Sequence, residues 1–110
     1  MQSSSFDRAT AVPAHKGTIL AAPVLPGGLH EPFKHSWGYI EGRSEMAAHS
    51  HPAEEVYLFV KGRGVVTVDG EERVMRPGDV VNIPANAVHT VRNDSDEPLL
   101  WAALWWPAPE

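Results

Sequence analysis

Short apolar runs separated by clusters of glycine and proline dominate the pattern of hydrophobic and polar positions along the chain. The runs cover residues 18–25, 36–40, 56–60, 65–68, 72–75, 80–83, 87–92 and 98–106. They have the length and the turn-residue borders of strands, and no stretch holds a convincing helical period. Asp69-Gly70, between two of the runs, is a strong signal for a tight hairpin. The pattern therefore predicts an all-β sandwich or barrel.

The segment before the first run is different. Residues 1–17 show no such pattern, and we expect them to form an irregular N-terminal arm. Residues 18–110 are expected to form one domain, because a chain of 110 residues has room for a single hydrophobic core.

Composition and charge exclude several classes of function. The formal net charge of −5 leaves no basic surface for nucleic acid or for an anionic membrane. No apolar run approaches the length of a membrane span, and the first residues lack a signal-peptide pattern. The chain has no cysteine, so it can form neither a disulfide nor a thiolate metal site. A cytoplasmic location is the default expectation.

Three histidines and one glutamate have the spacing of a metal site: His49, His51, Glu55 and His89. In an extended segment, residues two apart point to the same face, so His49 and His51 project together. Pro52 favours an extended or turning backbone just before it, which suits a bend between two strands. Imidazole and carboxylate together suit divalent transition metals such as Fe, Mn, Ni, Cu and Zn.

The alternation of side chains along a strand decides which of the two adjacent glutamates can belong to the site. In the run that begins near Val56, Glu55 lies on the face of Tyr57 and Phe59, whereas Glu54 lies on the opposite face. Only one of the two adjacent glutamates can therefore join the histidines, and the sequence favours Glu55.

These residues resemble the two motifs of the cupins. The first cupin motif reads Gly, about five residues, His-x-His, three or four residues, Glu, six residues, Gly. Its counterparts here are Gly42, His49, His51, Glu55 and Gly62. The second motif reads Gly, five residues, Pro-x-Gly, two residues, His, three residues, Asn. Its counterparts are Gly78, Pro84, Asn86, His89 and Asn93.

Two positions depart from the cupin motifs. The first gap is one residue longer, and Asn86 stands where the family has glycine. Asn is among the non-glycine residues that best tolerate a positive φ, so the turn expected there is retained. The resemblance covers residues 42–93, and it implies a double-stranded β-helix of the jelly-roll type.

The resemblance also implies one divalent metal ion, with iron favoured, held by the cupin ligand positions. These positions fall on His49, His51, Glu55 and His89. The other three histidines, His15, His30 and His35, lie outside the motifs, and we expect them to be surface or hydrogen-bonded residues.

Side chains that share a strand face with the ligands are candidates for the substrate pocket. The expected pocket residues are Trp37, Tyr39, Phe59 and Ile83. Tyr57 is the candidate catalytic residue, because a buried phenol needs a partner that a substrate or a metal-bound water could supply. The alternative is that these side chains only fill the core, as apolar strand residues mostly do.

Two classes of function follow. The first is a metal-dependent enzyme, most simply an Fe(II)-dependent, dioxygenase-like oxidation of a small uncharged or aromatic substrate, with an isomerase or lyase as alternatives. Three imidazoles and one carboxylate leave coordination positions open for water, dioxygen or substrate. The second class is a metal- or sugar-binding cupin without turnover. The scaffold alone does not decide between them.

The last run predicts an assembly. Residues 99–106 are apolar on both alternating faces, which implies that both faces are covered. One face can pack into the barrel. The other requires a second subunit, or residues 1–17 folded back over it, and we expect a homodimer.

Overall fold

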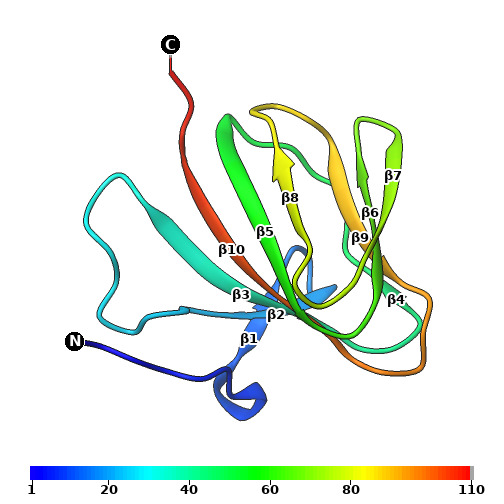
Figure 1. The fold of residues 1–110 in the computed structure, drawn as a ribbon, viewed down its shortest axis with the longest axis horizontal. Coiled ribbons are helices and arrows are strands. Elements are labelled where there is room, and N and C mark those ends of the chain that lie inside the picture. Colours follow the sequence, from blue (N-terminus) through cyan, green and yellow to red (C-terminus); the bar gives the residue numbers. More distant parts are fainter. Residues whose placement is uncertain (110) are drawn as a thin grey trace.

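Antiparallel strands form two sheets that face each other as a barrel in the computed structural model, which describes residues 1–109 (Figure 1). The elements are η1 (Arg8–Thr10), β1 (Val12–Ala14), β2 (Ile19–Ala22), β3 (Lys34–Ile40), β4 (Ser44–Glu45), β5 (Ala53–Lys61), β6 (Gly64–Val68), β7 (Glu71–Met75), β8 (Val80–Ile83), β9 (His89–Asn93) and β10 (Leu99–Pro107). The six-stranded sheet has the order β1-β2-β3-β10-β5-β8, and the four-stranded sheet has the order β4-β9-β6-β7. The predicted all-β jelly-roll barrel is confirmed.

A strand is found at each predicted run, although the bounds differ and the first run shortens to β2. The tight hairpin is confirmed between β6 and β7, where Asp69 and Gly70 have φ of 46° and 85°, as a primed turn requires. Strands β1 and β4 were not predicted. Strand β1 lies within the arm and pairs with β2, so residues 12–14 of the arm belong to the sheet. No helix within residues 1–109 is long and apolar enough to cross a membrane.

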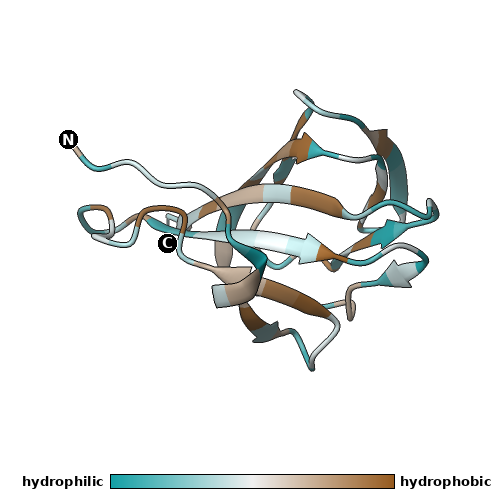
Figure 2. Ribbon diagram, turned by 90° about the horizontal axis from the view of Figure 1, so that it is seen from below, coloured by the Kyte–Doolittle hydropathy of each residue, from teal (hydrophilic) through white to brown (hydrophobic). Residues whose placement is uncertain are grey.

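The core lies between the two sheets and follows from alternation along the strands. Hydrophobic segments lie mainly on the strands (Figure 2). On β10, Leu99, Trp101 and Ala103 are buried, whereas the residues between them are only partly buried. The Trp101 ring lies against Gly38 of β3, where an added Cβ would come within 2.2 Å of the ring. Gly38 therefore makes the space that the largest core side chain occupies.

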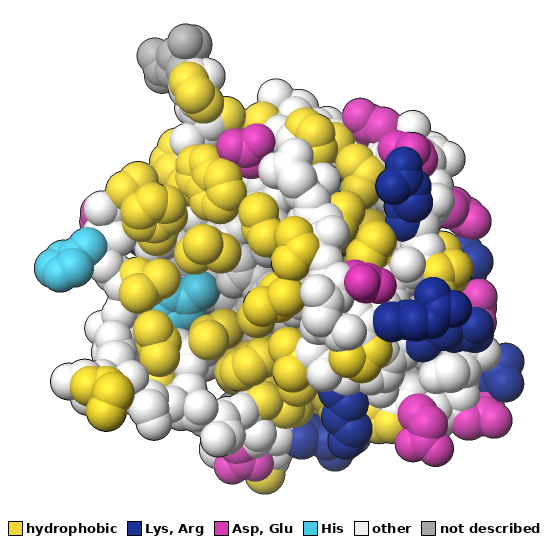
Figure 3. Space-filling view, in the orientation of Figure 1, with side chains coloured by type: hydrophobic (Ala, Val, Ile, Leu, Met, Phe, Trp, Pro, Cys, Tyr) yellow, Lys and Arg dark blue, Asp and Glu magenta, His cyan; other side chains and the backbone are white. Residues whose placement is uncertain are grey.

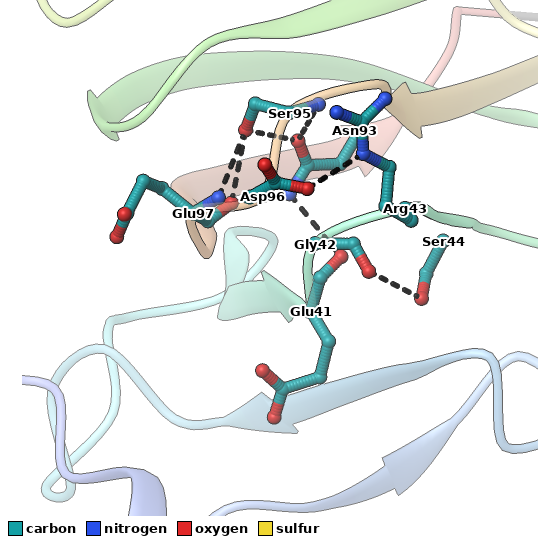
Figure 4. Close-up of polar contacts among 8 residues, drawn as sticks. All are labelled: Glu41, Gly42, Arg43, Ser44, Asn93, Ser95, Asp96 and Glu97. Carbon is teal, nitrogen blue, oxygen red and sulfur yellow. Dashed lines mark hydrogen bonds and ion pairs between the residues drawn. The ribbon is translucent and has the colours of Figure 1, made fainter.

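A hydrogen-bonded loop pair closes the end of the barrel that holds Gly42 and Asn93 (Figure 4). The Asn93 side chain, 1% exposed, donates to the carbonyls of Glu41 and Glu97 and accepts from the Ser95 backbone and hydroxyl. Gly42 packs so closely on this loop that an added Cβ would lie 2.5 Å from the Asp96 carbonyl oxygen. These two motif positions therefore join the β3–β4 turn to the β9–β10 loop.

The outer face of the six-stranded sheet is apolar. Hydrophobic side chains gather over the region of β3, β10 and β5, whereas charged side chains gather at the edge over β6 and β7 (Figure 3). Leu58, Val60 and Val80 are 42%, 44% and 56% exposed on this face. The arm covers only part of it, because Phe6 stacks on Tyr39 of β3 and contacts the edge of Trp37.

We expect Asn93→Ala to lower the free energy of unfolding by about 2–3 kcal/mol, because buried carbonyls would lose their donor. Urea denaturation followed by tryptophan fluorescence measures this change. The control is Asp96→Ala in the same loop, which removes only the exposed ion pair with Arg43 and should have little effect. Equal unfolding midpoints for the two variants would contradict the role given to Asn93.

A second copy of the chain is expected to cover the part of the outer face that the arm leaves open. Light scattering at micromolar concentration should give a mass near twice 12.0 kDa, because a two-fold pairing buries this patch in both copies. Leu58→Asp should shift the mass toward the monomer, whereas Val74→Asp, on the other sheet and similarly exposed at 45%, should not. A wild-type mass near 12 kDa would rule out the dimer.

Candidate metal centre

The four predicted ligands lie where the chain crosses from one sheet to the other. After β4 the backbone continues beside β9, and His49 and His89 form a β-bridge with N–H to O distances of 3.1 and 2.9 Å. The chain then passes through His51 and enters β5, which carries Glu55 in the other sheet. Asn86 holds the crossing, because its N–H donates to the His51 carbonyl at 2.7 Å. Asn86 has the positive φ that the sequence predicts, at 69°.

Each of the three histidines is oriented by the backbone carbonyl of a residue two positions away in the chain. The Nδ1 atoms of His49, His51 and His89 lie 3.0, 3.0 and 2.9 Å from the carbonyl oxygens of Ala47, Ala53 and Ala87. A carbonyl can only accept, so each Nδ1 carries the proton and donates it. This arrangement leaves Nε2 as the ring nitrogen available to a metal, which is the usual arrangement of histidines that bind metals.

The three histidine side chains approach one another through their ring nitrogens. One ring nitrogen from each histidine lies within 4.8 Å of the corresponding atoms of the other two. Glu55 Oε1 lies 3.0 Å from Nε2 of His51 and 3.6 Å from Nε2 of His89. His89 is 1% exposed, and its Nε2 has no hydrogen-bond partner within the described chain. A buried nitrogen without a partner is costly unless something binds it, and a divalent transition metal fits this donor set.

Burial sets the protonation of the group. It lowers the pKa of His89 to about 4, so the imidazole is neutral near pH 7, as a metal ligand must be. Burial also raises the pKa of Glu55 above its ordinary value, although the close approach of His51 partly opposes this shift. A cation beside Glu55 would favour its carboxylate form.

A cavity of about 380 Å³ opens beside these ligands. Its walls are mostly apolar or aromatic, and they are formed by Ala14, His15, Ile19, Ala21, Ser36, Trp37, Gly38, His49, His51, Ala53, Glu55, Tyr57, Trp101, Ala103 and Trp105. None of these described residues is Lys or Arg. His89 lies behind the wall, within the core.

The predicted pocket residues on β3 lie differently from expectation. Tyr39 is on the outer face of the sheet, stacked on Phe6 with ring centroids 5.3 Å apart, and it does not line this cavity. Trp37 borders the cavity, but its ring contacts Phe6 edge-on at 5.9 Å. The reason is that Gly38 and Ile40 take the inner face of β3, since the Trp101 ring requires the space at Gly38.

The other predicted positions divide between cavity and core. Tyr57 lines the cavity and is 3% exposed. Phe59 and Ile83, at 1% and 0% exposed, are not among the cavity residues and instead fill the core. Burial raises the pKa of Tyr57 well above its ordinary value, and the nearby Glu55 charge adds to the shift, so the phenol keeps its proton at neutral pH.

One residue of the site was missed. His15 is exposed, as expected, yet its ring stacks on His49 with ring centroids 4.0 Å apart and planes inclined by 21°, and it lines the cavity. Its contact depends on how the β1–β2 hairpin packs, which no local spacing reveals. The other expectations agree with the structure: His30 is exposed, and His35 accepts a hydrogen bond from the Val24 N–H at 3.0 Å.

Curated proteins of known activity resemble part of this chain in sequence. The chain is 38% identical over 64 residues to a gentisate 1,2-dioxygenase of a Streptomyces species, covering 57% of this chain and 18% of that protein. It is 32% identical over 87 residues to a glucose-6-phosphate isomerase of Pyrococcus horikoshii, covering 74% of this chain and 42% of that protein. The chain thus spans less than half the length of these relatives.

A solved structure and a family model also match this chain. A Cupin 2 conserved barrel domain protein from Salinispora arenicola superposes with a TM-score of 0.84 at 29% identity, covering 98% of this chain and 90% of the other. The family model described as a cupin domain matches residues 35–107, which include the four predicted ligands. This chain belongs to the cupin domain family.

Proposed function

We propose that this protein is a metal-dependent enzyme that oxidises a small uncharged or aromatic substrate. In this proposal His49, His51, Glu55 and His89 bind one divalent transition metal. The observation that carries it is the set of three imidazoles whose Nδ1 atoms are tied to backbone carbonyls while one ring nitrogen of each converges beside Glu55. Such a set is a ligand group already in its binding orientation.

Iron is the favoured metal, and Mn, Ni, Cu and Zn suit the same donors. Four protein ligands leave coordination positions open on an ion that prefers five or six. The chemistry that a bound metal supplies is polarisation of a substrate oxygen and, for iron, electron transfer with dioxygen. The protein's own contribution is to orient the ligands and to exclude water from the cavity.

The cavity walls favour an uncharged or aromatic substrate. Sites for phosphorylated sugars place Lys or Arg beside the phosphate. Here no Lys or Arg lies among the described lining residues, and both Arg43 and Lys34 form ion pairs outside the cavity, with Asp96 and Glu31. This contrast supports oxidation over sugar-phosphate isomerisation, although relatives of both kinds are found.

Tyr57 is the proposed contact for the substrate. Its buried phenol lines the cavity beside Glu55 and remains protonated, so it can donate a hydrogen bond to a substrate oxygen. In this role it positions the substrate against the metal ligands on the same strand face.

The metal assignment is tested by replacing ligands. The wild-type chain, purified without added metal, should contain close to one ion, with iron the major metal by elemental analysis. His51→Ala and His89→Ala should fall well below one ion while circular dichroism stays that of the folded barrel, because the core supplies most of the stability. His30→Ala, an exposed histidine, is the control. Full occupancy in the His51→Ala, His89→Ala double variant would defeat the assignment.

The reaction is tested with iron-loaded protein in an oxygen electrode. Catechol and gentisate probe oxidation, and glucose 6-phosphate probes isomerisation. We expect oxygen consumption with a phenolic probe, and a Tyr57→Phe variant about three- to tenfold lower in kcat/KM, the effect of one lost hydrogen bond. Binding of every probe without consumption would support the alternative, a binding cupin. Conversion of glucose 6-phosphate would favour an isomerase.

A further inference from the structure

The hairpin between β1 and β2 has an unusual backbone at the point where it meets the metal centre. His15 and Lys16 have φ of 49° and 61°, and Gly17 follows with 77°. Left-handed backbone in non-glycine residues costs about 1 kcal/mol or more per residue, so surrounding contacts must hold it. Thr18 supplies such contacts, because its N–H and its hydroxyl both donate to the His15 carbonyl, at 3.2 and 2.7 Å.

The same hydroxyl connects the hairpin to the ligand segment. Thr18 Oγ1 accepts the N–H of Ala47 at 2.9 Å, and the Ala47 carbonyl in turn accepts from Nδ1 of His49 at 3.0 Å. The His49 ring then stacks on the His15 ring at 4.0 Å. The contacts thus connect four residues in a ring, in the order His15, Thr18, Ala47, His49 and back to His15.

The other two histidines are held by different means. Glu55 Oε1 lies within ion-pair distance of His51 and His89, and His89 is also buried on all sides. For His49, within residues 1–109, no carboxylate lies at such a distance. Its ring face is supported instead by His15.

The hairpin lies outside the part of the chain that matches the family. The cupin model begins at residue 35, whereas the hairpin spans residues 12–22. The support for His49 is thus supplied by a segment that precedes the matched region, and the same segment forms part of the cavity wall through Ala14, His15, Ile19 and Ala21.

We propose that His15 is a positioning residue of the metal centre, holding the His49 ring in its binding orientation by stacking, with Thr18 fixing the hairpin that presents it. This inference rests on the proposed metal site at His49, His51, Glu55 and His89. His15 acts through the face of its ring rather than as a ligand.

The test compares His15→Ala with His15→Phe in the full chain, using Co²⁺ alone as the probe. His15→Phe keeps a stacking ring and removes both nitrogens. We expect His15→Ala to weaken Co²⁺ binding about tenfold, the usual scale for a residue that orients a ligand, and His15→Phe to remain close to wild type with an unchanged visible Co²⁺ spectrum. Lys16→Ala, on the same hairpin, is the control and should bind like wild type.

Substitutions at Thr18 test the proposal independently. Thr18→Val keeps the shape of the side chain and removes the hydroxyl, so it should weaken Co²⁺ binding in the same direction as His15→Ala, and Thr18→Ser should restore it. Urea denaturation of every variant shows that binding is compared between folded proteins.

The outcomes separate the two proposals. Wild-type binding by both His15→Ala and Thr18→Val would overturn the positioning role while leaving the metal site intact. Equal loss in His15→Ala and His15→Phe, with an altered Co²⁺ spectrum, would make His15 a ligand and also overturn it. Failure of the wild type to bind Co²⁺ would defeat the metal site. The stacking can also be measured without metal, from the NMR chemical shifts of the His49 ring protons. These shifts should differ from wild type in His15→Ala and remain close to wild type in His15→Phe.

Discussion

The site depends on the crossing of the chain between two sheets within a few residues. His49 is paired through its backbone to His89 beside the four-stranded sheet, and Glu55 lies on β5 of the six-stranded sheet. Strand pairing fixes backbone positions to within a few tenths of an ångström, so the ligands inherit their spacing from the two ladders. Pro52 and the hydrogen bond from Asn86 to His51 hold the short connection between the ladders. The geometry of the candidate metal centre is therefore set by the way the chain closes the barrel.

The polar residues buried inside the barrel separate structural from functional roles. Asn93 has both its amide nitrogen and its oxygen engaged by neighbouring loops. His89 is equally buried, yet its Nε2 is left without a partner in the described chain, and the pKa of the adjacent Glu55 is raised by burial. A fully satisfied buried polar group stabilises a fold, whereas an unsatisfied one is a cost that a ligand can remove. The end of the barrel at Asn93 is therefore suited to stabilising the fold, and the end at His89 is suited to binding a ligand.

Much of this could be predicted from the sequence, because strand periods and turn residues are local. The hairpin at Asp69-Gly70 and the positive φ of Asn86 follow from the chain alone. The choice of which face of β3 points inward does not, since Trp37 and Tyr39 are as apolar as Gly38 and Ile40, and only the packing of Trp101 against Gly38 selects the inner face. His15 could not be found either, because its contact joins segments that are distant in sequence.

Two parts of the chain line the cavity, and this affects how the site could select a substrate. Ligands and aromatic side chains come from the region that matches the family, whereas part of the rim comes from the β1–β2 hairpin before it. No Lys or Arg lies among the described lining residues, so a bound metal would be the main positive charge available to orient a substrate. A metal can orient the oxygen atoms it binds, but the rest of a small substrate must be placed by shape. A change in the β1–β2 hairpin is therefore expected to alter the shape available to a substrate while the ligand positions stay the same.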